Sequence, residues 1–113
     1  MPHFVIEYSR DVAEKADMQE VMRAAFDAGV ATGEMSAEAL KVRARAYDEY
    51  VMHEEGKSFV HMTVFLLEGR DEAQKDKIGS MLLGALTGAL TSVNSISIDI
   101  RDMDAKAYQK VVQ

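Results

Sequence analysis

The same order of secondary-structure signals occurs twice along this chain, and that repetition constrains its fold more than any other feature. Each half begins with a β-branched and aromatic stretch, at residues 4–8 and 59–67, which is typical of a strand. Apolar residues at three- and four-residue spacing follow each stretch and predict a helix. Alternating segments at residues 40–47 and 95–100 then predict one more strand in each half.

Capping and turn-forming residues set the expected limits of the two helices. Ser9 or Asp11 is the expected N-cap of the first helix, because a short side-chain oxygen can accept an orphan backbone N–H. Gly29 and Gly33 are expected to end that helix. The second helix is predicted over residues 72–90. Its buried stripe is expected to consist of Ile78, Met81, Leu82, Ala85, Leu86, Ala89 and Leu90.

Two polar segments complete the chain. Residues 48–57 are predicted to connect the two halves, with a short strand over residues 50–52. Residues 101–113 form a polar tail in which helical turns are expected between residues 105 and 111.

These elements predict an α+β fold in a single domain covering residues 1–113, because 113 residues is the size of one domain. Each strand–helix–strand unit places its two strands parallel through a right-handed crossover. The expected product is one four-stranded sheet with both helices on one face. Residues 59–67 are apolar on both sides of the predicted strand, so the uncovered face predicts burial by symmetric self-association.

Composition and charge exclude several classes of function. The net charge of −6 argues against a nucleic-acid-binding or anionic-membrane surface, which needs a basic face. No apolar run reaches the roughly 18 residues needed to span a bilayer. Without a basic, apolar leader at the N-terminus, the expected location is the cytoplasm. The absence of cysteine excludes disulfides and thiolate metal sites.

Established catalytic motifs give no further candidates. The sequence contains no phosphate-binding loop, dinucleotide fingerprint, zinc-protease motif or nucleophile elbow. His3, His53 and His61 lack the spacing of metal ligands and are expected to be structural or surface residues. We therefore expect neither a metal nor another cofactor.

Pro2 is the first candidate for chemistry. It directly follows the initiator methionine, and a small residue there favours removal of that methionine. Removal would expose a secondary amine, and an α-amino group has a reference pKa of about 7.7–8.0. Nearby cations and partial burial would lower this pKa further, which would make the nitrogen a general base near neutral pH. The alternative is that the proline merely begins the chain.

The second candidate is a group of arginines. Arg43 and Arg45 lie on one face of a predicted strand, roughly 6.6 Å apart at ~3.3 Å per residue. Arg70 lies at the predicted junction between strand and helix in the second half. A guanidinium binds a carboxylate through two hydrogen bonds, so these residues suit an acidic substrate. The alternative is a solvated face paired with glutamates.

Several runs of residues carry a resemblance to a known family. They are Met1-Pro2-His3-Phe4, Arg43-Ala44-Arg45, and Phe59-Val60-His61-Met62-Thr63 followed by Gly69-Arg70. Together they resemble the 5-carboxymethyl-2-hydroxymuconate isomerase branch of the tautomerase superfamily, over residues 2–100. The resemblance implies a homotrimer of β-α-β units and a mature chain that begins with a catalytic proline.

Carried over by position, the resemblance makes Pro2 the acid and base. It makes Arg43 and Arg70 contacts of a small carboxylate substrate, with Arg45 and His61 as further binding residues. The activity implied is cofactor-free ketonisation of a 2-hydroxymuconate-type dienol acid in the catabolism of aromatic compounds.

Two other functions fit the same order of elements. A ferredoxin-like module could bind a small molecule at the arginines without catalysis, and Pro2 would then be inert. A cofactor-independent oxygenase on a dimeric barrel would instead use His61 as its base.

Overall fold

The two β-α-β units form one mixed sheet in the computed structural model, which describes residues 2–113. The expected removal of Met1 falls outside the described residues. The sheet has strands β1 (His3–Ser9), β2 (Lys41–Tyr47), β3 (Phe59–Leu67) and β4 (Ser95–Met103). The helices are α1 (Met18–Ala31) and α2 (Glu72–Ala89), with a short 3₁₀ helix, η1 (Arg10–Glu14), after β1.

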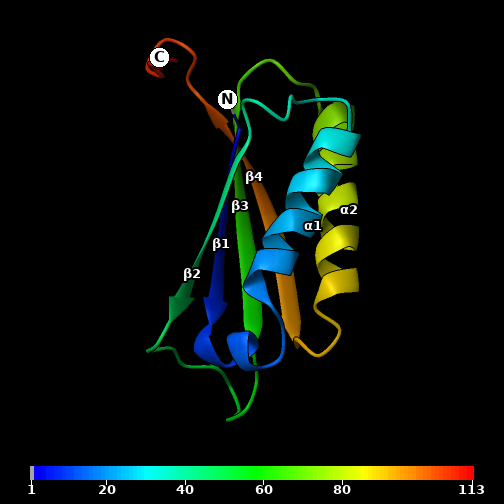
Figure 1. Cartoon of the computed structure of the whole chain (residues 1–113), viewed down its shortest axis with the longest axis vertical. Coiled ribbons are helices and arrows are strands. Elements are labelled where there is room, and N and C mark those ends of the chain that lie inside the picture. The colour runs from blue at the N-terminus through cyan, green and yellow to red at the C-terminus, as the bar shows by residue number, and fades with distance from the viewer. Residues whose placement is uncertain (1) are drawn as a thin grey trace.

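The strand order β2-β1-β3-β4 shows how the units join. Within each unit the two strands are parallel, β1 with β2 and β3 with β4. The units meet through their first strands, which pair antiparallel from His3 opposite Phe65 to Tyr8 opposite Val60. Both helices cover the same face of the sheet (Figure 1). The predicted α+β fold with both helices on one face is therefore confirmed.

The core lies between this face of the sheet and the helices. Alternation along β1 and β3 directs every second side chain toward the helices, including Phe4, Ile6 and Met62, all fully buried. Helix α2 contributes residues at four-residue spacing, which share one face of a helix. Its buried residues are Ile78, Leu82 and Leu86, and Leu90 at its C-cap is also buried.

The predicted start of the first helix is wrong, and of the two glycines predicted to end it only Gly33 does so, with a φ of 77° just after the C-cap. Ser9 makes no capping hydrogen bond, and the chain after it forms η1, so the α-helix begins only at Met18. Asp17 is the actual N-cap, since its side chain accepts a hydrogen bond from the backbone N–H of Gln19 (2.9 Å). Gly29 lies inside α1, which Thr32 caps.

Three smaller expectations also differ from the structure. Residues 50–52 form no strand. Met81 is 36% exposed, so it does not belong to the buried stripe of α2. Strand β4 continues beyond residue 100 to Met103, where parallel pairing with β3 extends it. The turn expected in the tail is present, closed by a hydrogen bond from Tyr108 N–H to the Asp104 carbonyl (3.0 Å).

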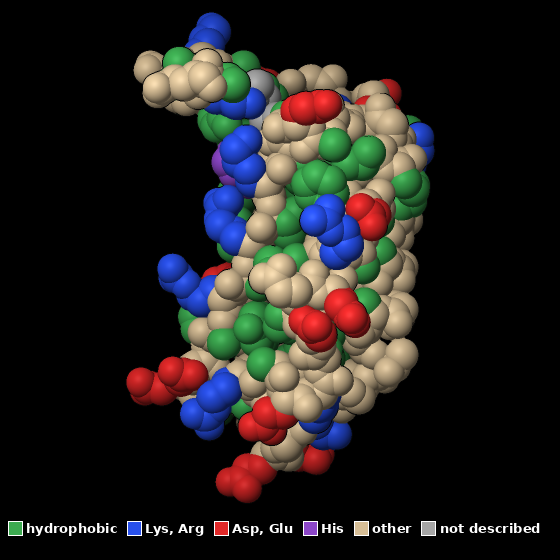
Figure 2. Space-filling view, in the orientation of Figure 1, with side chains coloured by type: hydrophobic (Ala, Val, Ile, Leu, Met, Phe, Trp, Pro, Cys, Tyr) green, Lys and Arg blue, Asp and Glu red, His purple; other side chains and the backbone are tan. Residues whose placement is uncertain are grey.

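The opposite face of the sheet is open in the single chain. On β3 it carries half-buried side chains, with apolar Phe59 and Phe65 on either side of polar His61 and Thr63. Basic side chains lie along the edge of the molecule formed by β2 (Figure 2). Within residues 2–113, no helix is long and apolar enough to cross a membrane.

One end of the sheet gathers the segments that matter for the site. Strands β1 and β2 begin there, β3 ends there, and α2 begins there (Figure 1). The residue before β1 therefore lies close to the connections that enter β2 and leave β3.

Gly29 allows close packing of α1 on the start of β1. A Cβ atom at this position would come within 2.9 Å of the Phe4 ring and 3.2 Å of the Met35 sulfur. The helix thus approaches the sheet at the point where only a hydrogen atom fits. Because Phe4 is fully buried, its ring has little room to move away.

We predict that Gly29→Ala lowers the free energy of unfolding by about 1–3 kcal/mol, because overpacking outweighs the better helix propensity of alanine. Gly84→Ala in α2 is the matched control, since a Cβ there meets nothing within 4 Å. It should raise the free energy of unfolding by up to about 1 kcal/mol. Urea unfolding measures both variants, and equal effects of the same sign would contradict the packing argument.

Candidate active site

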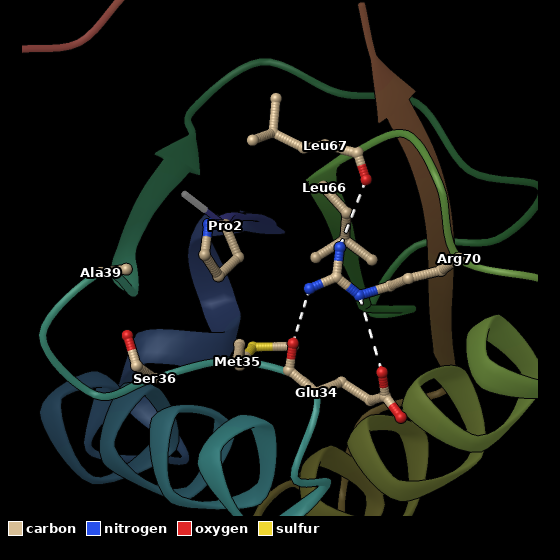
Figure 3. A pocket seen from close by; sticks show the side chains of 8 residues that line it. All are labelled: Pro2, Glu34, Met35, Ser36, Ala39, Leu66, Leu67 and Arg70. Atoms are coloured by element: carbon tan, nitrogen blue, oxygen red, sulfur yellow. Dashed lines mark hydrogen bonds and ion pairs between the residues drawn. The ribbon is translucent and has the colours of Figure 1, made fainter. Parts of the chain in front are cut away.

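A cavity of about 300 Å³ opens beside Pro2 at the end of the sheet where β1 begins. Figure 3 shows Pro2 on one side of this cavity and the Arg70 guanidinium facing it from the other. Pro2 is buried, and its carbonyl accepts a hydrogen bond from Lys41 N–H (3.2 Å) at the start of β2. The residues that line the cavity are Pro2, Glu34, Met35, Ser36, Ala39, Leu66, Leu67 and Arg70.

Arg70 lies in the connection from β3 to α2, and its guanidinium also contacts the connection from α1 to β2. Arg70 follows Gly69, whose φ of 123° is a backbone conformation that other residues rarely adopt. The guanidinium donates to the backbone carbonyls of Leu67 (3.2 Å) and Glu34 (2.5 Å). Each terminal nitrogen of a guanidinium carries two N–H groups, and these bonds use one of the two. One further N–H therefore remains on each terminal nitrogen. Arg70 Nε is buried and has no hydrogen-bond partner within residues 2–113.

Glu34 is a cavity residue that the sequence reasoning missed. Its carboxylate lies 3.9 Å from Arg70 Nε and accepts a hydrogen bond from Gln74 Nε2 (3.0 Å). Gln74 in turn completes a capping box with Asp71 at the start of α2. The capped helix therefore holds Glu34 in place. No local pattern indicates this, because 36 residues separate Glu34 from Arg70 and 40 from Gln74.

The other predicted arginines lie away from this cavity. Arg43 and Arg45 are exposed on the open face of β2, beside Val5 and Glu7 of β1. Neither forms an ion pair within residues 2–113, so the glutamate-paired alternative does not describe them. Of the three predicted arginines, a single chain brings only Arg70 together with Pro2.

His61 also lies on the open face, half-buried on β3. Its Nδ1 atom is 2.7 Å from the hydroxyl of Ser97, the residue opposite it on β4. Within one chain, His61 therefore does not line the cavity that contains Pro2.

His3, next to Pro2, connects three segments. Arg43 Nη1 lies 3.2 Å from its Nδ1, and the Tyr108 hydroxyl lies 3.1 Å from its Nε2. Because arginine only donates, Nδ1 accepts, and a neutral ring then carries its proton on Nε2 and donates it to Tyr108. Partial burial and the positive charges of Arg43 and Lys41 lower the pKa of His3 below its ordinary value of 6.5.

The arrangement suits proton transfer on an acidic substrate. A secondary amine at Pro2 could take and return a proton, while Arg70 holds a carboxylate or a developing oxyanion. Among residues 2–113, no group of three or more histidine or acidic side chains is placed to hold a metal ion.

A comparison with protein families identifies the lineage of the chain. Residues 2–111 match the family model of 5-carboxymethyl-2-hydroxymuconate isomerase. The chain belongs to this family. It is therefore a tautomerase-type isomerase, and the resemblance seen in its sequence is confirmed. A search of curated proteins finds no match.

Solved structures show the same fold. A 5-carboxymethyl-2-hydroxymuconate delta-isomerase is 21% identical, with a TM-score of 0.87 over 100% of this chain and 89% of that one. A 5-carboxymethyl-2-hydroxymuconate isomerase from Deinococcus radiodurans R1 is 21% identical, with a TM-score of 0.88 over 99% of this chain and 90% of that one. A fused wild-type 4-OT, solved as a symmetric trimer, is 19% identical, with a TM-score of 0.71 over 90% of this chain and 85% of that one.

The isomerase should lose stability on acidification partly through His3. The unfolded histidine has the higher pKa, so the unfolded chain binds the proton first as the pH falls. Stability that depends on neutral His3 is then present above pH 6.5 and is lost as the pH falls toward the lower folded-state pKa.

Urea unfolding at pH 7.5 and 5.5, at one protein concentration, measures this loss. His3→Gln should show a smaller difference between the two pH values than the unmodified chain. His53→Gln is the matched control, because the His53 side chain is 76% exposed. An unchanged difference in His3→Gln would contradict the assignment.

Proposed function

We propose that this isomerase ketonises a 2-hydroxymuconate-type dienol acid, with the Pro2 amine as both acid and base. The observation that carries the proposal is that Pro2 and Arg70 line one cavity from opposite sides (Figure 3). A proton carrier and a carboxylate receptor are the two groups that such a reaction needs. The reaction belongs to the catabolism of aromatic compounds, in which ring cleavage generates dienol acids.

The proton balance of the reaction requires no other reagent. After removal of Met1, the neutral Pro2 amine takes the proton of the enol hydroxyl. The oxygen lone pair forms the carbonyl, the double bonds shift along the chain, and a distant carbon takes the proton back from the ammonium. An amine whose pKa is about 7.7–8.0 or lower exchanges protons readily near neutral pH.

Arg70 supports this reaction through its remaining donors. The second N–H of each terminal nitrogen has no hydrogen-bond partner among residues 2–113. A substrate carboxylate or the enolate oxygen can accept from them, and charge-assisted bonds of this kind are stronger than neutral ones. Met35, Leu66 and Leu67 give the cavity an apolar wall against which a flat diene packs.

Arg43, Arg45 and His61 enter the proposal through a second copy of the chain. All three lie on the open face of the sheet, outside their own chain's cavity. In a homotrimer, this face of one copy would supply substrate contacts to the Pro2 cavity of its neighbour. The similar fold of the fused 4-OT, solved as a symmetric trimer, supports this assembly.

The two alternative functions have less support. The family match favours an isomerase over a ferredoxin-like module that only binds a ligand. The same match, to a family of isomerases, also disfavours the oxygenase that would use His61 as its base.

We predict that Pro2→Leu lowers kcat for dienol ketonisation by at least about 100-fold, the usual scale for loss of a general acid–base group, because a bulky second residue disfavours methionine removal and leaves an amide nitrogen. The loss of dienol absorbance in the ultraviolet measures the rate, and mass spectrometry establishes that Met1 is absent from the unmodified protein and present in Pro2→Leu. Pro2→Ala should lose less activity, because its mature chain still begins with an α-amine, although a primary one. Unchanged kcat in Pro2→Leu would remove the Pro2 amine from the mechanism.

The assembly makes a separate prediction. A Pro2→Leu copy, which retains Met1, and an Arg43→Ala copy, unfolded together and refolded, should form mixed oligomers in which some sites are complete. Their activity should clearly exceed that of either variant refolded alone. Activity no higher than the average of the two variants would show that Arg43 does not serve a neighbour's Pro2 cavity.

A further inference from the structure

Glu34 places a negative charge beside the Arg70 guanidinium, on the side away from Pro2 (Figure 3). Among the described residues that line the proposed catalytic cavity, Arg70 carries the only positive side-chain charge and Glu34 the only negative one. The two side chains are similarly shielded, at 22% and 20% exposed. The cavity of one chain therefore has a side-chain charge near zero, whereas the sequence alone predicts a cationic pocket.

The geometry lets the Glu34 carboxylate offset the charge of Arg70 without accepting a hydrogen bond from it. The carboxylate oxygen is 3.9 Å from Arg70 Nε, which is too long for a hydrogen bond. Gln74 Nε2 donates to that same oxygen at 3.0 Å and fixes its position. Arg70 thus keeps free N–H groups on its terminal nitrogens for a ligand, but its positive charge is partly offset by the carboxylate beside Nε.

We infer that Glu34 is a specificity-determining residue, which restricts this cavity to one carboxylate group of the substrate. The inference rests on the proposed function, because it takes Arg70 as the carboxylate receptor. An incoming carboxylate is attracted by Arg70 and repelled by Glu34. The far carboxylate of a dicarboxylate gains no cation from the same chain, so a dianion binds less tightly than Arg70 alone would allow.

Neutralising Glu34 should have two effects of predictable direction. The charge of Arg70 is then uncompensated, so anions bind more tightly, and dianions gain most. The same change disfavours the ammonium form of the Pro2 amine. The acid limb of the profile of kcat/KM against pH should therefore move to lower pH in Glu34→Gln.

The test uses two dienes that lack an enol, sorbate with one carboxylate and muconate with two. Their affinities are measured by calorimetry for the unmodified protein, Glu34→Gln and Glu34→Ala. Glu34→Gln keeps an oxygen for Gln74 to donate to, whereas Glu34→Ala does not, so an effect common to both arises from charge. Glu38→Gln is the matched control, because Glu38 is exposed on the same connection and does not line the cavity.

We expect both neutral variants at position 34 to bind muconate roughly tenfold more tightly, with a smaller gain for sorbate, and Glu38→Gln to stay within about twofold. Equal affinities in all four proteins, a matching gain in Glu38→Gln, or no muconate binding by any of them would overturn the inference.

The ketonisation assay on Pro2→Leu, in which Met1 is retained, separates this result from the proposed function. Lost ketonisation with unchanged muconate affinity in the position-34 variants would overturn the role of Glu34 alone. Retained ketonisation in Pro2→Leu together with tighter muconate binding would overturn the proline mechanism alone.

Discussion

The antiparallel pairing of β1 with β3 is the constraint on which the rest of the structure depends. It places the start of β1 opposite the end of β3, with His3 beside Phe65. Pro2 comes just before β1, and Arg70 comes just after β3 through the turn at Gly69. If the two units met through any other pair of strands, the amine and the guanidinium would not share one cavity. The register of a single strand pair thus creates the candidate site.

Much of the fold could be predicted because it follows from patterns within each element. Alternation identified β2 and β4, and β-branched and aromatic content identified β1 and β3. The predicted start of the first helix lies too near the N-terminus because Ser9 and Asp11 both have capping side chains. In the structure these two residues lie at the start of η1, and Asp17 caps α1. Side-chain chemistry alone does not show which of several capping residues is used.

The site was only partly predictable, for a physical reason. Pro2 and Arg70 were found from their chemistry and from a family resemblance, and the structure places them together. Alternation indicates the face of the strand on which Arg43 lies, but it does not show which part of the assembly covers that face. Arg43 was therefore predicted to share a site with Pro2, although it does not line the Pro2 cavity of its own chain. Glu34 could not be found, because its partners are brought to it only by the packing of α1 and α2 on the same sheet.

The account's central claim is that the Pro2 nitrogen is a free amine that titrates near neutral pH beside Arg70. An NMR titration of the mature chain labelled with ¹⁵N-proline reports on this atom alone, because Pro2 is the only proline. The account predicts one titration at or below the usual α-amino pKa of about 7.7–8.0, moving upward in Arg70→Gln because a neighbouring cation is lost. An amide-like nitrogen that does not titrate, or a titration that Arg70→Gln leaves unchanged, would contradict it.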